Sequence, residues 1–114
     1  MRLIVGILLA FTLFAAPATA SPDGRIAQQQ ARAKVAICKT FREYCQEALR
    51  VSWCESKWYV WAQNGQYLGI FQMGSSERAK YGHGSGAWAQ ARAAHRYFVA
   101  SGRDWSPWSC RWAA

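Results

Sequence analysis

Glu55 has the surroundings in this sequence that best suit acid catalysis. It stands in Cys54-Glu55-Ser56, where an amphipathic helix is predicted to end, and a glycine-led apolar turn follows at residues 69–73. A carboxyl group at a helix C-terminus meets the negative end of the helix dipole, and apolar neighbours further disfavour its charged form. Both effects favour the protonated acid, the form that can protonate the leaving oxygen of a glycosidic bond. We therefore predict that Glu55 is a general acid rather than an ordinary solvated residue closing a helix.

Aromatic residues are dense in the sequence around this acid: Trp53, Trp58, Tyr59, Trp61 and Tyr67. Flat rings suit the apolar faces of sugars, while Trp N–H and Tyr O–H groups find polar partners. Seven Trp in so small a domain must nevertheless mostly pack the core, and we expect Trp53, Trp88 and Trp108 to be buried. Trp58, Trp61 and Tyr67 are then the aromatic candidates for ligand contact.

A second carboxylate close to Glu55 would indicate a two-carboxylate mechanism, and its absence would favour a single-acid mechanism. Glycosidases with two carboxylates hold them about 5 Å apart for retention or about 6.5–9.5 Å apart for inversion. After residue 20 the other acids are Asp23, Glu43, Glu47, Glu77 and Asp104. Glu47 precedes Glu55 by two helical turns, about 12 Å along the axis, and Glu77 and Asp104 are predicted in a first helical turn and a loop. Those two stay open as partners, but the sequence favours a single-acid mechanism.

The first twenty residues have the pattern of a secretion signal. Arg2 precedes an apolar run at residues 3–16, and Ala18-Thr19-Ala20 forms a small-x-small cleavage site. An uncleaved membrane anchor is the alternative, but the run is short for a span and Pro17 interrupts it. We expect residues 1–20 to be removed, which leaves 114 − 20 = 94 residues, the size of one small domain.

Four cysteines in the exported part predict two disulfides: Cys38, Cys45, Cys54 and Cys110. No Cys-x-x-Cys pair supports a zinc site, so no metal is expected. Three pairings are open. Cys38 and Cys45 would lie about 10.5 Å apart along a continuous helix, whereas a disulfide needs Cα atoms within about 7 Å. We favour a helix break at residues 39–43, with Cys38–Cys45 across the corner and Cys54–Cys110 joining the acid's helix to the C-terminal end.

The hydrophobic pattern predicts a mainly α fold with, at most, a short β-hairpin. Residues 21–37 form an N-terminal helical segment, and residues 38–114 form the main domain. Apolar residues recur at helical spacing over residues 44–55 and 87–101, and Ser75 is a suitable N-cap for a short helix. Residues 56–74 are either a loop or a hairpin turned at Asn64-Gly65.

These motifs resemble the lysozyme-like superfamily, and more narrowly the soluble lytic transglycosylases and the resuscitation-promoting-factor domain of actinobacteria. The resemblance covers about residues 38–112 and depends on the helix ending in Cys54-Glu55-Ser56, the Gly-apolar-apolar-Gln turn at residues 69–72, an Ala-rich helix and a Trp-containing tail with Cys110. It implies a small lysozyme-like fold in which Glu55 is the sole catalytic acid.

The same resemblance implies further substrate contacts. The turn at residues 69–72 matches the Gly-Leu-Met-Gln-type turn that lines the glycan cleft, with Gln72 placed to hydrogen-bond near the acid or the sugar. Tyr97 matches a tyrosine that faces the site, and Gln90 stands where those enzymes usually have Asn. The predicted substrate-binding residues are therefore Gln72, Tyr67, Trp58, Trp61, Gly69, Ile70, Phe71, Tyr97 and Gln90.

The predicted activity is lytic transglycosylase cleavage of the MurNAc-GlcNAc β-1,4 bond of peptidoglycan. Glu55 would protonate the leaving oxygen, the substrate N-acetyl group would stabilise C1, and Glu55 would then deprotonate the C6 hydroxyl. The product is a 1,6-anhydromuramic end. One alternative is lysozyme-type hydrolysis, which needs a second carboxylate beside Glu55. Another is a non-catalytic, Trp-rich wall-binding module.

The formal charge is +8, or +7 once Arg2 is removed, and such a balance favours acidic partners. Peptidoglycan glycan strands, through their stem carboxylates, and anionic cell-wall polymers fit this charge in an exported protein. The secretion signal argues against nucleic acid. We expect a monomer without cofactor that is secreted, and is extracellular or associated with the cell wall.

Overall fold

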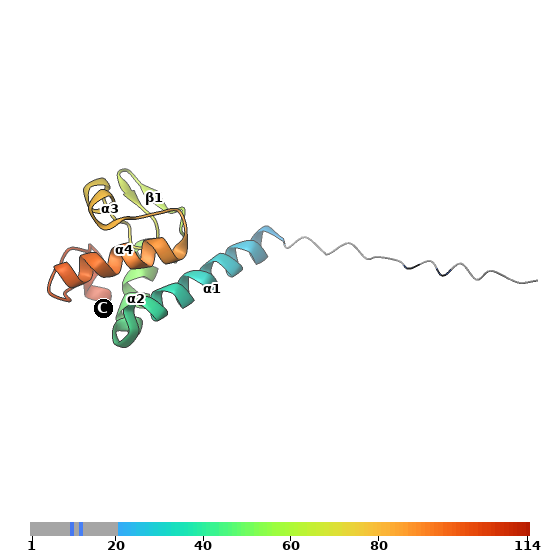
Figure 1. Cartoon of the computed structure of the whole chain (residues 1–114), viewed down its shortest axis with the longest axis horizontal. Helices are drawn as coiled ribbons and strands as arrows, with labels where there is room; N and C mark the ends of the chain where they lie inside the picture. Colours follow the sequence, from blue (N-terminus) through green and yellow to red (C-terminus); the bar gives the residue numbers. More distant parts are fainter. Residues whose placement is uncertain (1–9, 11, 13–20) are drawn as a thin grey trace, which may run out of the picture.

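The computed structural model of the chain describes Ala10, Thr12 and residues 21–114. The predicted secretion signal lies almost entirely outside these residues, so it stays a prediction. The described residues form four α-helices, two short 3-10 helices and one two-stranded sheet (Figure 1). The prediction of a mainly helical fold is therefore confirmed.

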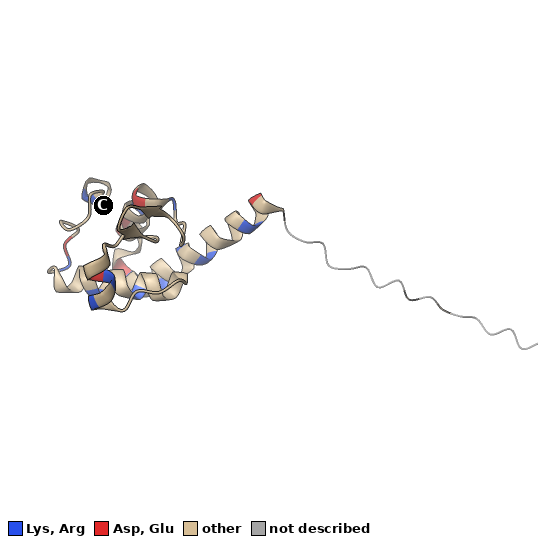
Figure 2. Cartoon of the chain, turned by 90° about the horizontal axis from the view of Figure 1, so that it is seen from above, with Lys and Arg blue, Asp and Glu red and all other residues tan. Residues whose placement is uncertain are grey.

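Helix α1, Pro22–Phe41, covers the predicted N-terminal segment and continues beyond it. Its N-terminus is capped by Ser21, whose hydroxyl accepts a hydrogen bond from the Gly24 N–H at 3.1 Å. Pro22 in the first turn is compatible with a helix start, and Asp23 complements the positive end of the dipole. Lys and Arg residues recur along the helix, so α1 presents positive charge over most of its length (Figure 2).

The chain turns sharply between α1 and α2, as the cysteine spacing predicted. The helix ends at Arg42, whose φ is 52°, and a 3-10 helix, η1 (Arg42–Tyr44), leads into α2, Cys45–Ser56. The Cys38–Cys45 disulfide bridges this corner with its Cα atoms 4.5 Å apart. The helix break at Arg42 brings the two cysteines within reach, which a continuous helix would not allow.

Residues 63–68 form a hairpin, so of the two alternatives for this region the hairpin is confirmed. Strand β1 (Gln63–Asn64) pairs antiparallel with β2 (Tyr67–Leu68), and Asn64 faces Tyr67. The turn is therefore Gly65-Gln66, one residue later than predicted. Gly65 has a φ of 60°, which suits a glycine at the first central position of a two-residue hairpin loop.

Two further α-helices and a 3-10 helix complete the fold: α3 (Ser75–Tyr81), α4 (Ala87–Ala100) and η2 (Arg111–Ala113). The N-cap of α3 is Gly74, whereas Ser75 was predicted. Ser75 is already the first helical residue, and the Gln66 side chain accepts hydrogen bonds from both its N–H and its hydroxyl. Figure 1 shows α1 running along one side of α2 and α4, with the hairpin and α3 on the other side of α4.

Aromatic rings form the centre of the core. Phe41, at the end of α1, contacts Phe71 at a centroid distance of 5.3 Å and Trp105 at 5.5 Å. Trp105 in turn packs on Phe98 of α4 at 4.4 Å and on Trp108 at 5.1 Å. The core therefore joins α1, the turn after the hairpin, α4 and the C-terminal segment.

The predicted burial of Trp residues is only partly right. Trp108 is buried, with 4% of its surface exposed, but Trp53 and Trp88 are each 45% exposed. Trp105, which was not predicted, is buried instead. The helices α2 and α4 turn smaller side chains to the core, so their Trp residues face solvent; these smaller residues are Ala48, Val51, Ala91, Ala93 and Ala94.

The second disulfide joins Cys54 of α2 to Cys110 in the C-terminal segment, 56 residues later, with a Cα separation of 6.0 Å. The favoured pairing is therefore confirmed, and two disulfides are typical of proteins from oxidising compartments. In the described part of the chain, no helix is both long and apolar enough to cross a membrane.

The two disulfides should differ in their contribution to stability. Replacing Cys54 and Cys110 with Ser opens a loop of 56 residues and should lower the free energy of unfolding by about 4 kcal/mol. The same change at Cys38 and Cys45 opens a loop of 7 residues and should cost about 2 kcal/mol. Urea denaturation of both double variants tests this order, and a larger loss at the corner would contradict it.

Candidate active site

Glu55 lies in the last turn of α2, and the C-terminal segment holds its side chain. Oε1 accepts one hydrogen bond from the Ser109 hydroxyl and one from the Cys110 backbone N–H, both at 2.9 Å. The Cys54–Cys110 disulfide begins at the neighbouring residue, so it fixes the segment that carries both donors. Ser109 was not among the predicted site residues, although the favoured cysteine pairing would place residue 109 near residue 55.

Glu55 opens onto a cavity of about 440 Å³ between the hairpin, α3, α4 and the C-terminal segment. The structure brings four of the predicted residues together there. These are Glu55, Tyr67, Gln72 and Tyr97. The rest of the lining is mixed in character and consists of Asn64, Gln66, Met73, Gly74, Ser76, Glu77, Pro107, Trp108 and Ser109. Polar amides, carboxylates and aromatic rings in one cavity suit a ligand with both hydroxyl groups and apolar faces.

The turn at residues 69–72 is held by hydrogen bonds from Gln72 within it and from Trp108 in the C-terminal segment. Gln72 has a φ of 46° and donates through Nε2 to the carbonyl oxygens of Ala62 at 2.9 Å and Gly69 at 3.0 Å. The Trp108 ring N–H donates to the Phe71 carbonyl at 3.0 Å. Gln72 lines the cavity as predicted, but its amide N–H groups are used within the protein.

Gln90 holds this turn from α4. The side chain is buried, its Oε1 accepts from the Ile70 N–H at 2.9 Å, and Nε2 donates to the carbonyls of Val60 at 2.9 Å and Gly84 at 3.0 Å. A Cβ at Gly69 would lie 2.5 Å from Gln90 Oε1, and the φ of Gly69 is 85°, so only glycine fits there.

Four of the predicted substrate-binding residues are consequently placed elsewhere. Gly69, Ile70, Phe71 and Gln90 are buried and do not line the cavity. The apolar side chains of the turn, Ile70 and Phe71, are part of the buried core and point away from the cavity. These four residues therefore support the cavity wall from its buried side and do not contact the cavity.

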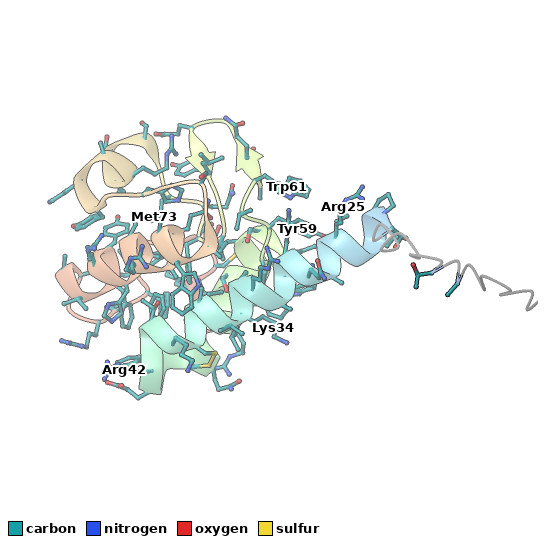
Figure 3. All side chains as sticks on the ribbon, turned by 45° about the vertical axis from the view of Figure 1, so that its right-hand side comes forward. Arg25, Lys34, Arg42, Tyr59, Trp61 and Met73 are labelled. Carbon is teal, nitrogen blue, oxygen red and sulfur yellow. A yellow bond between two sulfur atoms is a disulfide. The ribbon has the colours of Figure 1, made fainter. Side chains whose placement is uncertain are left out.

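Trp58 and Trp61 also lie away from the cavity. The Trp58 ring rests on α2, where its N–H donates to the Leu49 carbonyl and the Ser52 hydroxyl, both at 3.1 Å. Trp61 stacks on Tyr59 at 4.7 Å, and its ring N–H donates to Gln29 of α1 at 3.1 Å (Figure 3). Of the three predicted aromatic contacts, only Tyr67 faces the cavity of Glu55.

The structure distinguishes between the two candidate residues, Glu77 and Asp104, for a second carboxylate near Glu55. Glu77, in the first turn of α3, lines the same cavity as Glu55. Asp104 lies outside it, and its Oδ1 accepts a hydrogen bond from the Ser106 N–H at 2.9 Å, which closes a local turn. Of these two acids, only Glu77 could act with Glu55.

Tyr97 of α4 lines the cavity. Burial raises the pKa of its hydroxyl most, and Glu77, Tyr81 and Tyr67 raise it further. The hydroxyl therefore stays protonated at neutral pH. Neither histidine lines the cavity. Burial is the main cause that lowers the pKa of each, with Arg78 acting next on His83 and Arg103 next on His95.

Among the described residues, no group of three or more His, Cys, Asp or Glu could hold a metal ion. The chemistry of the cavity is that of carboxyl, hydroxyl and amide groups. In comparisons with protein-family models, with curated proteins and with solved structures, the chain matches none. The lysozyme-like resemblance therefore stays a prediction.

Replacing Gln90 with Leu should loosen the turn. The change leaves the Ile70 N–H and the Val60 and Gly84 carbonyls without their partner, so we expect a loss of about 3 kcal/mol in the free energy of unfolding. Gln28→Leu, at an exposed position of α1, is the control and should change it by less than about 0.5 kcal/mol. Equal effects in urea denaturation would contradict the role given to Gln90.

Proposed function

We propose that this protein is a secreted lytic transglycosylase that cleaves the MurNAc-GlcNAc β-1,4 bond of peptidoglycan. The observation that carries the proposal is the setting of Glu55. Its carboxyl group lines a cavity, and two donors hold it through Oε1. No hydrogen bond from the described residues reaches Oε2, which leaves that oxygen able to exchange a proton with a substrate.

The cavity wall supports a sugar ligand. Tyr67, which is 47% exposed, provides ring surface, and Asn64, Gln66 and Tyr97 provide groups that hydrogen-bond hydroxyl and acetamido groups. The walls come from the hairpin, α4 and the C-terminal segment, which the core and the second disulfide fix relative to α2. Fixed walls are what a catalyst needs to hold a glycosidic oxygen within proton-transfer distance of Glu55.

The proposed reaction uses one acid twice. Glu55 donates its proton to the glycosidic oxygen as the C1–O bond breaks, and the carbonyl oxygen of the substrate's own N-acetyl group bonds to C1. The Glu55 carboxylate then removes the proton of the C6 hydroxyl, O6 bonds to C1, and the acetamido oxygen leaves. No water is consumed, Glu55 regains its proton, and the product ends in 1,6-anhydromuramic acid.

The charge of the protein fits the same substrate. Arg and Lys outnumber Asp and Glu by 14 to 6, and the positive positions along α1 give anionic polymers a surface to approach (Figure 2). We propose that the monomer acts outside the cell or at its wall on peptidoglycan strands, with anionic wall polymers as secondary partners.

Glu55→Gln should abolish cleavage while the protein stays folded. The amide cannot donate a proton to the leaving oxygen, so release of fragments from purified peptidoglycan should fall by about a thousandfold. Mass spectrometry of the released muropeptides should show wild-type products lighter by one water at the muramic end. Glu47→Gln, on the same helix but outside the cavity, is the matched control and should cleave normally. Retained cleavage by Glu55→Gln would overturn the assignment of the acid.

A lysozyme-type hydrolase is the second candidate, because Glu77 shares the cavity with Glu55. If the single-acid mechanism holds, Glu77→Gln should lower the cleavage rate by less than about tenfold and leave the anhydro ends unchanged. Asp104→Asn, outside the cavity, is its control. Hydrated reducing ends from the wild type, with cleavage lost in Glu77→Gln, would favour hydrolysis. Binding to the wall without any release would favour a non-catalytic wall-binding module.

A further inference from the structure

A second hollow lies on the side of α2 that faces away from Glu55. Successive helical residues are rotated by about 100°, so Trp53 points roughly 160° away from Glu55. The hollow has a volume of about 390 Å³ and is lined by Lys34, Gln46, Leu49, Arg50, Trp53 and Trp58. We call it the Trp53–Trp58 surface. It shares no lining residue with the cavity of Glu55.

The two Trp residues of this surface differ in how the rest of the protein holds them. Trp53 is 45% exposed and tilts at 58° to the Trp58 ring, with a centroid distance of 4.7 Å. Trp58 is fixed by two hydrogen bonds from its ring N–H, and by a third from its backbone N–H to the Ser56 hydroxyl at 3.1 Å. The surface therefore offers one fixed ring and one exposed ring at an angle before any ligand arrives.

The backbone that places Trp58 is strained. Lys57 has a φ of 53° and Trp58 a φ of 63°, two consecutive non-glycine residues in the left-handed region. Side chains with a Cβ disfavour this region, and such strain is retained where the surrounding structure needs the resulting geometry. Here it folds the chain back so that the Trp58 ring lies on α2.

The two charged residues beside the rings, Lys34 and Arg50, are both positive. The Lys34 ammonium lies 5.0 Å from the centre of the Trp58 ring, and Arg50 donates through Nε to the Ala113 carbonyl at 3.0 Å. Among the residues that the structure describes, no acidic side chain lines the surface. In Figure 3 Lys34 lies on the side of α1 away from Tyr59 and Trp61, so this surface is separate from that stacked pair.

We propose that the Trp53–Trp58 surface binds an anionic glycan. The apolar face of a pyranose would stack on the exposed Trp53 ring, with the Trp58 ring beside it, and a carboxylate or phosphate substituent would meet Lys34 and Arg50. A lipid surface fits less well, because the Trp58 ring is held on α2 by its N–H and cannot insert between lipids. The site is independent of the chemistry at Glu55: it holds a polymer on the opposite face of the helix.

Calorimetric titration of oxidised protein carrying Glu55→Gln, which the proposed function makes inactive, tests this site. The probes are a hyaluronan decasaccharide, which is anionic, and chitohexaose, which is neutral. Trp53→Ala should weaken hyaluronan binding by about tenfold. Trp88→Ala is the matched control, since Trp88 is equally exposed at 45% but lies on α4 outside the surface, and it should change binding less than about twofold. Lys34→Gln should weaken hyaluronan binding more than chitohexaose binding.

Three outcomes would overturn the proposal. Equal effects of Trp53→Ala and Trp88→Ala would show that no ring of this surface is used. Polyglutamate binding as tightly as hyaluronan, and insensitive to Trp53→Ala, would show charge attraction without sugar recognition. Binding to anionic phosphatidylglycerol vesicles but to neither saccharide would assign the surface to a membrane. Because the measurement is of binding, and neither saccharide contains the muramic acid on which the proposed reaction depends, its result does not depend on whether Glu55 is a catalytic acid.

Discussion

The hydrogen bonds from residues 109 and 110 to Glu55 connect the chemistry of this protein to its whole fold. Glu55 is on α2, near the middle of the chain, and both donors come from the C-terminal segment. That segment is held by the adjacent disulfide and by Trp105 and Trp108, which are buried in the core. The carboxyl group therefore keeps its orientation only while the core, the disulfide and the last residues of the chain are all in place.

A second set of contacts holds the opposite wall of the cavity. Gln90 binds the turn from behind through three backbone groups, and Trp108 binds the same turn through the Phe71 carbonyl. Trp108 thus contacts the core, the turn and the cavity at once. The turn at residues 69–72 therefore supports the cavity mainly from its buried side, since only Gln72 of its residues lines the cavity.

Local patterns predicted the helices and the corner well, because helical periodicity and the reach of a disulfide depend on nearby residues. The break after Phe41 lies within residues 39–43, where the favoured pairing of Cys38 with Cys45 requires it. Burial of Trp residues could not be predicted in the same way. Periodicity shows that a helix has two faces, but the packing partners decide which face is inside. Apart from Phe98 of α4, the apolar residues that α2 and α4 bury are small. Trp58 was misplaced because the left-handed backbone at residues 57–58 has no glycine to indicate it. The contact of Ser109 with Glu55 joins residues 54 positions apart in the sequence, which meet only in the folded state.

The order of residues along the chain bears on when the site can form. Glu55 belongs to the second α-helix, whereas Trp105, Trp108, Ser109 and Cys110 follow α4. A nascent chain made only as far as Gly102 therefore contains all four α-helices but lacks these groups. Glu55 acquires its hydrogen-bond partners, and Cys54 its disulfide partner, only after every α-helix of the described fold has been synthesised.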